Sequence, residues 1–342
     1  TPSVISISTG SASGWQSIRK LGETLQSGSI TTTGEFQVIG ENVGTIGAGS
    51  IAAAVINDTA TGDAASSDKG ATAPQGGGEY GIGVSGAASV NITRQNLAAY
   101  ISYANINHTG NLDLQALTET LTVAIVGAIT INTSTVGSNT GGIAGSFGWN
   151  DITSKTQAFI NHSNIIISGG DLNLKATNDD LIVGISISFS IVIEGWAGAG
   201  AVVVNQIDTV TKSFITNQSD ITLTGGGATL DTDDDSLIVG VAGAVAYGGK
   251  TVGIGASVVV SLIDKVVQSF IKNSDLIMTG LLDLSAHTNA NIITVAIAIA
   301  VSKGNMALAI SVTVVMIEAN TSVYISGKKS GGKGIEAAGG VT

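Results

Sequence analysis

A cluster of aspartates is the feature of this chain best suited to bind a cation, because carboxylate oxygens are ligands that Ca²⁺ prefers in proteins. The cluster consists of Asp231, Asp233, Asp234 and Asp235. We expect it in a turn before an apolar segment. The equivalent position carries Asp179 and Asp180 in one other repeat but Glu119 in another, and no GGxGxDx array is present. The cluster is a weak Ca²⁺ candidate, and the alternative is a solvated turn whose acids discourage unwanted strand pairing. No other cofactor is expected.

A glycine-rich stretch at residues 81–86, GIGVSG, matches the GxGxxG pattern of dinucleotide-binding folds. That pattern needs a strand before it and a helix after it, so that the pyrophosphate meets the helix N-terminus. The aligned stretch that begins at Gly253 continues with the alternation typical of a strand. We therefore expect no nucleotide site.

The three histidines, His108, His162 and His287, are the other side chains with metal-binding or catalytic chemistry. None lies near a second histidine at ligand spacing, and no Ser/His/Asp grouping can be placed. We expect them in exposed loops, and we expect no enzymatic activity. A polysaccharide lyase on a β-helix is the enzyme alternative, and it would need a carboxylate or basic cleft that the sequence does not show.

Seven N-x-S/T sequons would carry glycans if the protein is exported by an organism that N-glycosylates, and they would then mark exposed turns. With so much serine and threonine, several sequons arise by chance. They begin at Asn57, Asn91, Asn107, Asn132, Asn161, Asn217 and Asn320.

The segments that position these residues recur with a period of roughly 56 residues, and self-similarity at a fixed period predicts a repeat architecture. Each copy contains an aromatic residue followed by isoleucine, and the aromatics are almost evenly spaced along the chain. The pairs are Tyr100-Ile101, Phe159-Ile160, Phe214-Ile215, Phe270-Ile271 and Tyr324-Ile325. A phrase close to S-x-I-x-I/L-x-G-x-L-x-L-x-A follows most pairs.

Residues 293–317 form the clearest apolar part of the repeat, with two alternating runs joined by four turn-forming residues, 302–305. A period of two puts large aliphatic side chains on one face of a strand and Gly, Ala, Ser and Thr on the other. We read the segment as a β-hairpin. We expect the large-aliphatic face to form a dry core and the small-residue face to pack closely against another backbone layer. The predicted fold is all-β and elongated, either a β-solenoid or a multilayered stack of β-hairpins, with about five copies.

One continuous body is expected, in three parts. Residues 1–80 form a divergent repeat with a long loop at 57–80, residues 81–325 form the tandem β-repeats, and residues 326–342 form a tail rich in Gly and Lys. The chain is expected to start on a second arm, at residues 1–13, and to stop before a first arm. Unpaired strand edges at both ends would favour head-to-tail assembly.

Composition narrows the classes of partner. The net charge is −11 and no basic stripe is visible, so nucleic acid is not an expected partner. The chain has no cysteine, which excludes a disulfide framework and thiolate metal sites. Because the chain has only two prolines, almost all of its backbone amides are free to pair in long sheets. No apolar run reaches the roughly 20 residues of a membrane-spanning helix.

The repeat phrases resemble those of a known group. The pattern GxGxSVxVxxI at residues 253–263, the aromatic-Ile pair and SDLIMTGLLDLSA at residues 274–286 resemble repeats of very large bacterial surface adhesins. These are of the filamentous-haemagglutinin-like and leukotoxin-like autotransporter or two-partner type. The resemblance implies a secreted or surface-attached, non-enzymatic β-solenoid used for adhesion or as a stalk.

Three functions follow as hypotheses. The first is an extracellular structural protein that self-assembles, through β-sheet packing between copies of itself, into a cell-surface fibre, sheath or stalk. The second is a segment of a large adhesin that binds a host or neighbour-cell ligand, a surface glycan or a host protein, through the loop at 57–80. The weakest is an outer-membrane β-barrel, since the apolar arms are long enough to cross a bilayer as strands but aromatic residues are scarce.

Overall fold

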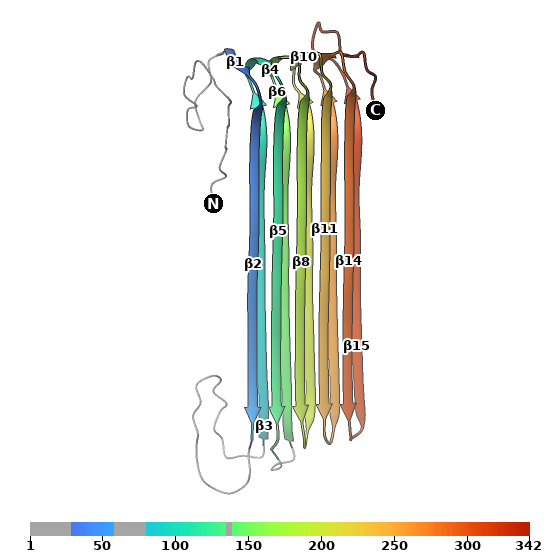
Figure 1. The fold of residues 1–342 in the computed structure, drawn as a ribbon. Coiled ribbons are helices and arrows are strands. Elements are labelled where there is room, and N and C mark those ends of the chain that lie inside the picture. Colours follow the sequence, from blue (N-terminus) through green and yellow to red (C-terminus); the bar gives the residue numbers. More distant parts are fainter. Residues whose placement is uncertain (1–28, 58–79, 135–138) are drawn as a thin grey trace.

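A computed structural model of the chain describes residues 29–57, 80–134 and 139–342. Every helix or strand in these ranges is a β-strand, and the 16 strands follow one another in a repeating order of one short strand and two long ones. Each round of three strands forms one coil of a β-solenoid (Figure 1). The expected all-β repeat fold, with about five copies of a repeat of roughly 56 residues, is confirmed.

The coils build three parallel sheets. The short strands form the end sheet, in the order β1 (Ser29–Thr33), β4 (Asn105–Thr109), β7 (Asn164–Ser168), β10 (Asp220–Thr224), β13 (Asp275–Met278) and β16 (Ile335–Ala337). The first long strands form sheet 1, in the order β2 (Phe36–Ile56), β5 (Leu112–Asn132), β8 (Leu172–Val192), β11 (Ala228–Gly248) and β14 (Leu282–Ser302). The second long strands form sheet 2, in the order β3 (Tyr80–Ser102), β6 (Asn139–Asn161), β9 (Trp196–Thr216), β12 (Val252–Lys272) and β15 (Met306–Ser326).

The expected hairpins are wrong. β14 and β15 are consecutive, yet β14 pairs with β11 in sheet 1 and β15 pairs with β12 in sheet 2, both in parallel. The turn at residues 302–305 therefore carries the chain from one sheet to the facing sheet. A short turn between alternating runs suits either arrangement, but the repeat supplies an in-register partner one coil away along the whole length of β14. Strands of a porin pair antiparallel, so that alternative does not describe this fold either.

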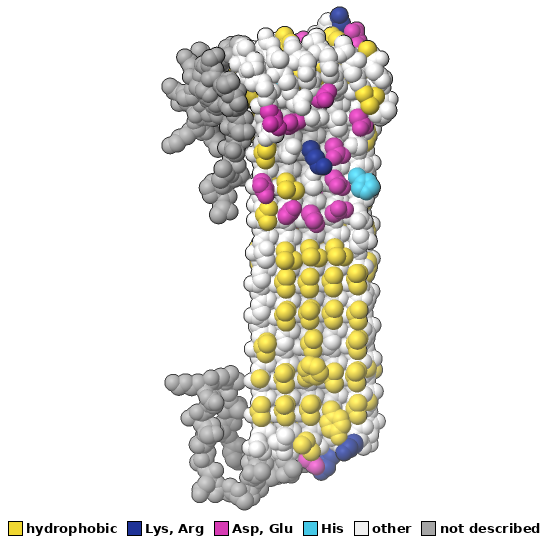
Figure 2. Space-filling model, viewed as in Figure 1, with side chains coloured by type: hydrophobic (Ala, Val, Ile, Leu, Met, Phe, Trp, Pro, Cys, Tyr) yellow, Lys and Arg dark blue, Asp and Glu magenta, His cyan; other side chains and the backbone are white. Residues whose placement is uncertain are grey.

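The inward face is the small-residue face, which reverses the expectation for the core. On β11, Ala242, Ala244 and Ala246 are fully buried between the broad sheets, whereas Val239 and Val241 lie on the outer face. Figure 2 shows the resulting rows of hydrophobic side chains on the outside of sheet 1. The large aliphatic residues expected to form a dry core between the sheets are thus largely on the surface. The expectation that the small face packs closely against another layer is confirmed.

The spacing between the broad sheets explains this choice. A Cβ atom added to Gly184 of β8 would lie 2.4 Å from Asn205 Oδ1 and 2.8 Å from Asn150 Nδ2, both on the facing sheet. Any larger side chain at Gly184 would collide with these amides. Close approach of two backbones is a position for which glycine is suited.

A conventional aliphatic core exists where the end sheet closes one side of the solenoid. Ile165, Ile221 and Leu276 of the end sheet are fully buried there, together with leucines such as Leu172 and Leu230 from the start of the broad strands. These residues belong to the shared S-x-I…G-x-L-x-L phrase. The phrase therefore encodes the short strand, its glycine turn and the entry into sheet 1.

The aromatic residues of the repeat stack into one ladder, which confirms that they occupy equivalent positions. Successive ring centroids of Tyr100, Phe159, Phe214, Phe270 and Tyr324 lie 5.1, 4.8, 4.9 and 4.9 Å apart, with interplanar angles of 7° or less. The isoleucine after each aromatic points to the opposite face of sheet 2. The pair thus fixes both faces of the strand at the same register in each coil.

The Gly/Lys-rich tail at residues 326–342 is the beginning of a sixth coil. Its β16 pairs with β13, and Asp275 accepts backbone hydrogen bonds from Lys329 (3.1 Å), Lys333 (2.7 Å) and Gly334 (2.9 Å). Burial alone would raise the pKa of Asp275, but these N–H groups and the Lys329 charge outweigh it and lower the pKa. The expected boundary at residue 80 falls inside the first coil, between β2 and β3. The expected arm at residues 1–13 and most of the loop at 57–80 lie outside the described residues.

The aromatic ladder yields a stability prediction. Phe214 stacks on two rings and Tyr324 on one. We expect Phe214→Ala to lower the free energy of unfolding by roughly 3 kcal/mol and Tyr324→Ala by roughly half as much, because each aromatic pair adds to the loss of buried area. Urea unfolding followed by circular dichroism measures both, and equal losses would contradict the ladder.

Candidate interaction surfaces

The aspartates of the proposed calcium cluster lie inside β11 and not in a turn. Asp231, Asp233 and Asp235 are on the outer face of sheet 1, whereas Asp234 points into the interior. Alternate residues of a strand point to opposite faces, so the four carboxylates cannot converge on one cation. Within the described ranges, no group of three or more His, Cys, Asp or Glu side chains is arranged to hold a metal ion. The calcium candidate is therefore not assembled.

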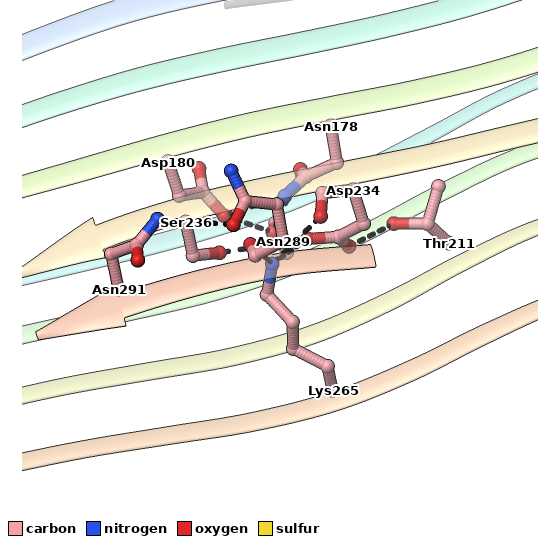
Figure 3. A network of polar contacts seen from close by, with 9 residues as sticks. Asn178, Asp180, Thr211, Asp234, Ser236, Lys265, Asn289 and Asn291 are labelled. Atoms are coloured by element: carbon pink, nitrogen blue, oxygen red, sulfur yellow. Dashed lines mark hydrogen bonds and ion pairs between the residues drawn. The ribbon is translucent and has the colours of Figure 1, made fainter. Parts of the chain in front are cut away.

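Asp234 instead forms an ion pair in the interior (Figure 3). Lys265 Nζ of β12 lies 2.7 Å from Asp234 Oδ1, and both side chains are fully buried. The same ammonium donates to the backbone carbonyls of Asp234 (2.8 Å) and Asn289 (2.7 Å), and Thr211 donates to Asp234 Oδ2 (2.5 Å). All three ammonium protons thus have acceptors. The pair joins sheet 2 to sheet 1 at one defined register.

Asp180 of β8 is a second buried carboxyl in the same layer. Its Oδ2 atom accepts hydrogen bonds from Ser154 (2.7 Å) and Asn178 (2.9 Å), but its Oδ1 atom is buried without a hydrogen-bond partner. Burial raises the pKa of Asp180 above its ordinary value, and the hydrogen bonds oppose this only in part. Sequence reasoning missed Asp180 and Lys265 as interior groups. Their place in the two-residue alternation would have revealed them once the small-residue face was known to point inward.

One of the histidines contradicts the expectation of exposed loops. His108 is fully buried in β4, where Thr32 donates to Nδ1 (2.8 Å) and Nε2 donates to the Asn111 carbonyl (2.9 Å). His162 and His287 are exposed, although His287 lies within β14. Residues 81–86 lie inside β3 and continue as strand, so the GxGxxG stretch does not lead into a helix.

Two of the sequons are buried, and two of the exposed ones lie inside strands and not in turns. Asn132 is fully buried and donates to backbone carbonyls, and Asn91 is 5% exposed and donates to Asn150 Oδ1 at 2.8 Å. Asn150 in turn donates to Asn205 Oδ1 at 2.8 Å, which forms an asparagine ladder in the interior. Neither Asn91 nor Asn132 can carry a glycan in this fold. Asn161 is half-buried, and the exposed sequons are Asn57, Asn107, Asn217 and Asn320.

The outer face of sheet 1 is divided into a polar half near the end sheet and an apolar half toward the opposite end (Figure 2). We call the second half the apolar face. It is formed by the outward side chains of residues 121–131, 181–191, 237–247 and 293–301, which pair in register. These ranges contain no charged residue. Ile293 and Ile297 are 57% and 52% exposed. Contiguous exposed apolar patches larger than a few hundred Å² are typical of interaction surfaces.

Sheet 2 also has an apolar half, at the same end of the molecule. It includes a groove of about 770 Å³ above Gly145, Gly198 and Gly200, with Trp196 and Ile254 among its lining residues. The groove follows from glycines at outward positions of neighbouring strands. Both broad surfaces of the solenoid are therefore apolar away from the end sheet.

The strand edges at the C-terminal end form the third surface. Sheet 1 ends at β14 and sheet 2 at β15, and only the first residues of β14 meet the segment at 340–342. The inward residues Val315 and Ile317 of β15 are 49% and 46% exposed, because no described strand lies beside β15 on that side. An unpaired edge of 21 residues is a template for pairing with another strand.

The architecture defines the chain as a β-solenoid repeat protein. No protein-family description, curated protein or solved structure matches it. The part of the chain that the structure describes contains no helix capable of spanning a membrane.

The ion pair predicts an asymmetry between single and double substitutions. Lys265→Met leaves the Asp234 carboxylate buried without its counter-charge, and we expect a loss of about 3–5 kcal/mol in the free energy of unfolding. Lys265→Met combined with Asp234→Leu removes both charges and should recover most of that loss. Chemical unfolding of the parent, the single variant and the double variant measures both changes. A single variant as stable as the parent protein would contradict the pairing.

From the raised pKa of Asp180 we expect the free energy of unfolding to depend on pH with the opposite sign to that of a salt-bridged acid. Because the folded pKa is raised, stability is highest below the unfolded pKa of about 4 and falls as pH rises through the folded pKa. Asp180→Asn removes the ionisation, so the variant should be more stable than the parent at pH 7 by about 1 kcal/mol or more. At pH 3 this difference in stability between variant and parent should be smaller, because the carboxyl of the parent is then protonated. Urea midpoints at both pH values test this. An equal difference at the two pH values would show that the Asp180 carboxyl does not carry the effect.

Proposed function

We propose that this chain is a non-enzymatic structural protein of the extracellular space, which assembles end to end into a cell-surface fibre, sheath or stalk. The observation that carries the proposal is the pair of open edges on β14 and β15. The β15 edge is as long as the ladders inside the solenoid, and the β14 edge is open beyond the first residues that meet the segment at 340–342.

The partner that fits these edges is the opposite end of another copy. β2 and β3 are the last described strands there, and they contain 21 and 23 residues. Parallel pairing of β14 with β2 and of β15 with β3 would continue both ladders from copy to copy, and it requires the segment at 335–342 to give up its place beside β13 and β14 to β1 and β2 of the next copy. At about 4.8 Å per strand, five coils would extend a fibre by roughly 24 Å for each copy.

The length of the strands and the side-chain ladders that connect the coils support a mechanical role. Strands of globular proteins usually contain 5–6 residues, so ladders of 21 residues give each coil an unusually long hydrogen-bonded contact with the next. The interior adds side-chain ladders of Asn and Ser, and the outer face of sheet 2 adds the aromatic ladder, all running along the same axis. The adhesin alternative would use residues 57–80 and stays a prediction.

Electron microscopy and sedimentation of the purified chain test the proposal. We expect filaments whose length grows with protein concentration. Val315→Lys combined with Ile317→Lys places charges on the inner side of β15. Water reaches this side in a single, unassembled copy, but the first coil of the next copy in a fibre would bury it. This variant should keep the circular dichroism of the parent and remain as short rods.

The matched control carries the same charges on the outer side of the same strand, as Val314→Lys combined with Met316→Lys. It should still form filaments. Short rods from the parent chain at every concentration would overturn end-to-end assembly, and rods that bind cells through residues 57–80 would establish the adhesin alternative.

A further inference from the structure

The apolar face of sheet 1 has no role in the end-to-end contact, because it lies on the broad side of the solenoid. We infer that this face binds the same face of a second copy, with the strands of the two copies antiparallel and shifted by one strand. The inference rests on the proposed structural role, in which copies pack on one another, and it adds the contact that sets the width of the assembly.

The size of the apolar face fits a stable interface. The face covers about half the length of β5, β8, β11 and β14, over the ranges that define it above. At about 3.3 Å per residue and 4.8 Å per strand, this is roughly 36 by 19 Å, or about 700 Å². The largest apolar patch on a monomeric protein is usually about 300–600 Å². A stable pair of proteins buries about 800 Å² on each partner.

The charges of the polar half fix the direction of packing. Glu119, Asp179 and Asp235 occupy one in-register row of the outer face, and Asp233 lies one row away. Burial and then the nearby Asp235 and Glu119 charges raise the pKa of Asp179. Two copies with parallel strands would bring these rows face to face across about 10 Å. Antiparallel strands overlap the apolar halves and leave the acidic halves apart in water.

The shape of one row fixes the offset. Gly127, Ile187, Gly243 and Ile297 are register partners on four neighbouring strands, so the row alternates between a side chain and a notch. A shift of one strand, about 4.8 Å, places Ile187 of each copy over a glycine of the other. Surfaces of facing sheets interdigitate in this way in sheet-on-sheet packing.

A second copy fits this surface better than a glycan does. The apolar face offers no charged side chain and almost no hydrogen-bonding side chain, with Tyr247 as the exception. Sugars are bound mainly through charged and hydrogen-bonding side chains, which this face almost entirely lacks. The matching surface, a flat array of aliphatic rows with the same strand spacing, is present on a second copy of the chain.

The test uses the full chain with Val315→Lys and Ile317→Lys, so that the lateral contact is measured without end-to-end growth. Sedimentation equilibrium should show a dimer. Ile185→Lys, at the centre of the apolar face, should raise the dissociation constant at least 100-fold. Val204→Lys, on the outer face of sheet 2, is the matched control and should leave the dimer unchanged.

Gly243→Val separates a fitted interface from general stickiness. A Cβ at Gly243 meets only Ile187 carbons at 3.9 Å, so the fold accepts the side chain. The variant adds apolar area but fills the notch, and it should raise the dissociation constant at least tenfold. Tighter dimers would overturn the inference.

The orientation is tested with a single spin label, which is feasible because the chain has no cysteine. Thr177→Cys places the label on β8 in the polar half, roughly 30 Å along the strand from the centre of the apolar face. Antiparallel strands predict a distance of roughly 60 Å between labels, and parallel strands predict less than about 30 Å. The shorter distance would overturn the proposed orientation.

Two results separate the lateral contact from end-to-end assembly. An edge-blocked chain that stays monomeric at 100 µM overturns the lateral contact and leaves end-to-end assembly standing. A parent chain that forms dimers but no filaments supports the lateral contact and overturns the proposed function.

Discussion

Close approach of the two broad sheets is the constraint on which the rest of this structure depends. A Cβ on Gly240 would lie 2.9 Å from both Asn205 Nδ2 and Val259 Cγ1 of the facing sheet. The interior therefore accepts Gly, Ala, Ser, Thr and Asn over most of its length. Large aliphatic residues are buried mainly beside the end sheet, and one layer of isoleucines, which includes Ile182 and Ile238, is buried between the broad sheets.

This constraint explains why the interior is polar and the surface is apolar. Small hydroxyl and amide side chains fill the narrow space and bond to one another along the solenoid axis, as in the ladder from Asn91 to Asn205. The aliphatic residues that alternate with them are turned outward, where a single copy cannot bury them. The same alternation that builds the coil thus creates broad surfaces suited to packing between copies, which supports the proposed structural role.

The repeat and its period could be predicted from the sequence because equivalent residues recur at nearly constant spacing. The ladder from Tyr100 to Tyr324 confirms that alignment. Which face points inward could not be predicted, since a period of two distinguishes two faces without saying which is buried. The hairpin was wrong for a related reason, because a short turn does not reveal whether its strands share a sheet. Aspartate is depleted in strands, which favours a turn for the cluster around Asp234, but the in-register neighbours of β11 outweigh that preference.

Which face of the long strands is buried can be tested most directly by the chemical accessibility of two neighbouring residues on β12, because the chain has no cysteine of its own. Val259 is fully buried between the sheets, and Val258 lies on the outer face of sheet 2. Single-cysteine variants at these positions are treated with a maleimide under native conditions. We expect rapid labelling of Val258→Cys and protection of Val259→Cys until the protein unfolds. Protection of the first and rapid labelling of the second would contradict it, because the large-aliphatic face would then be the core.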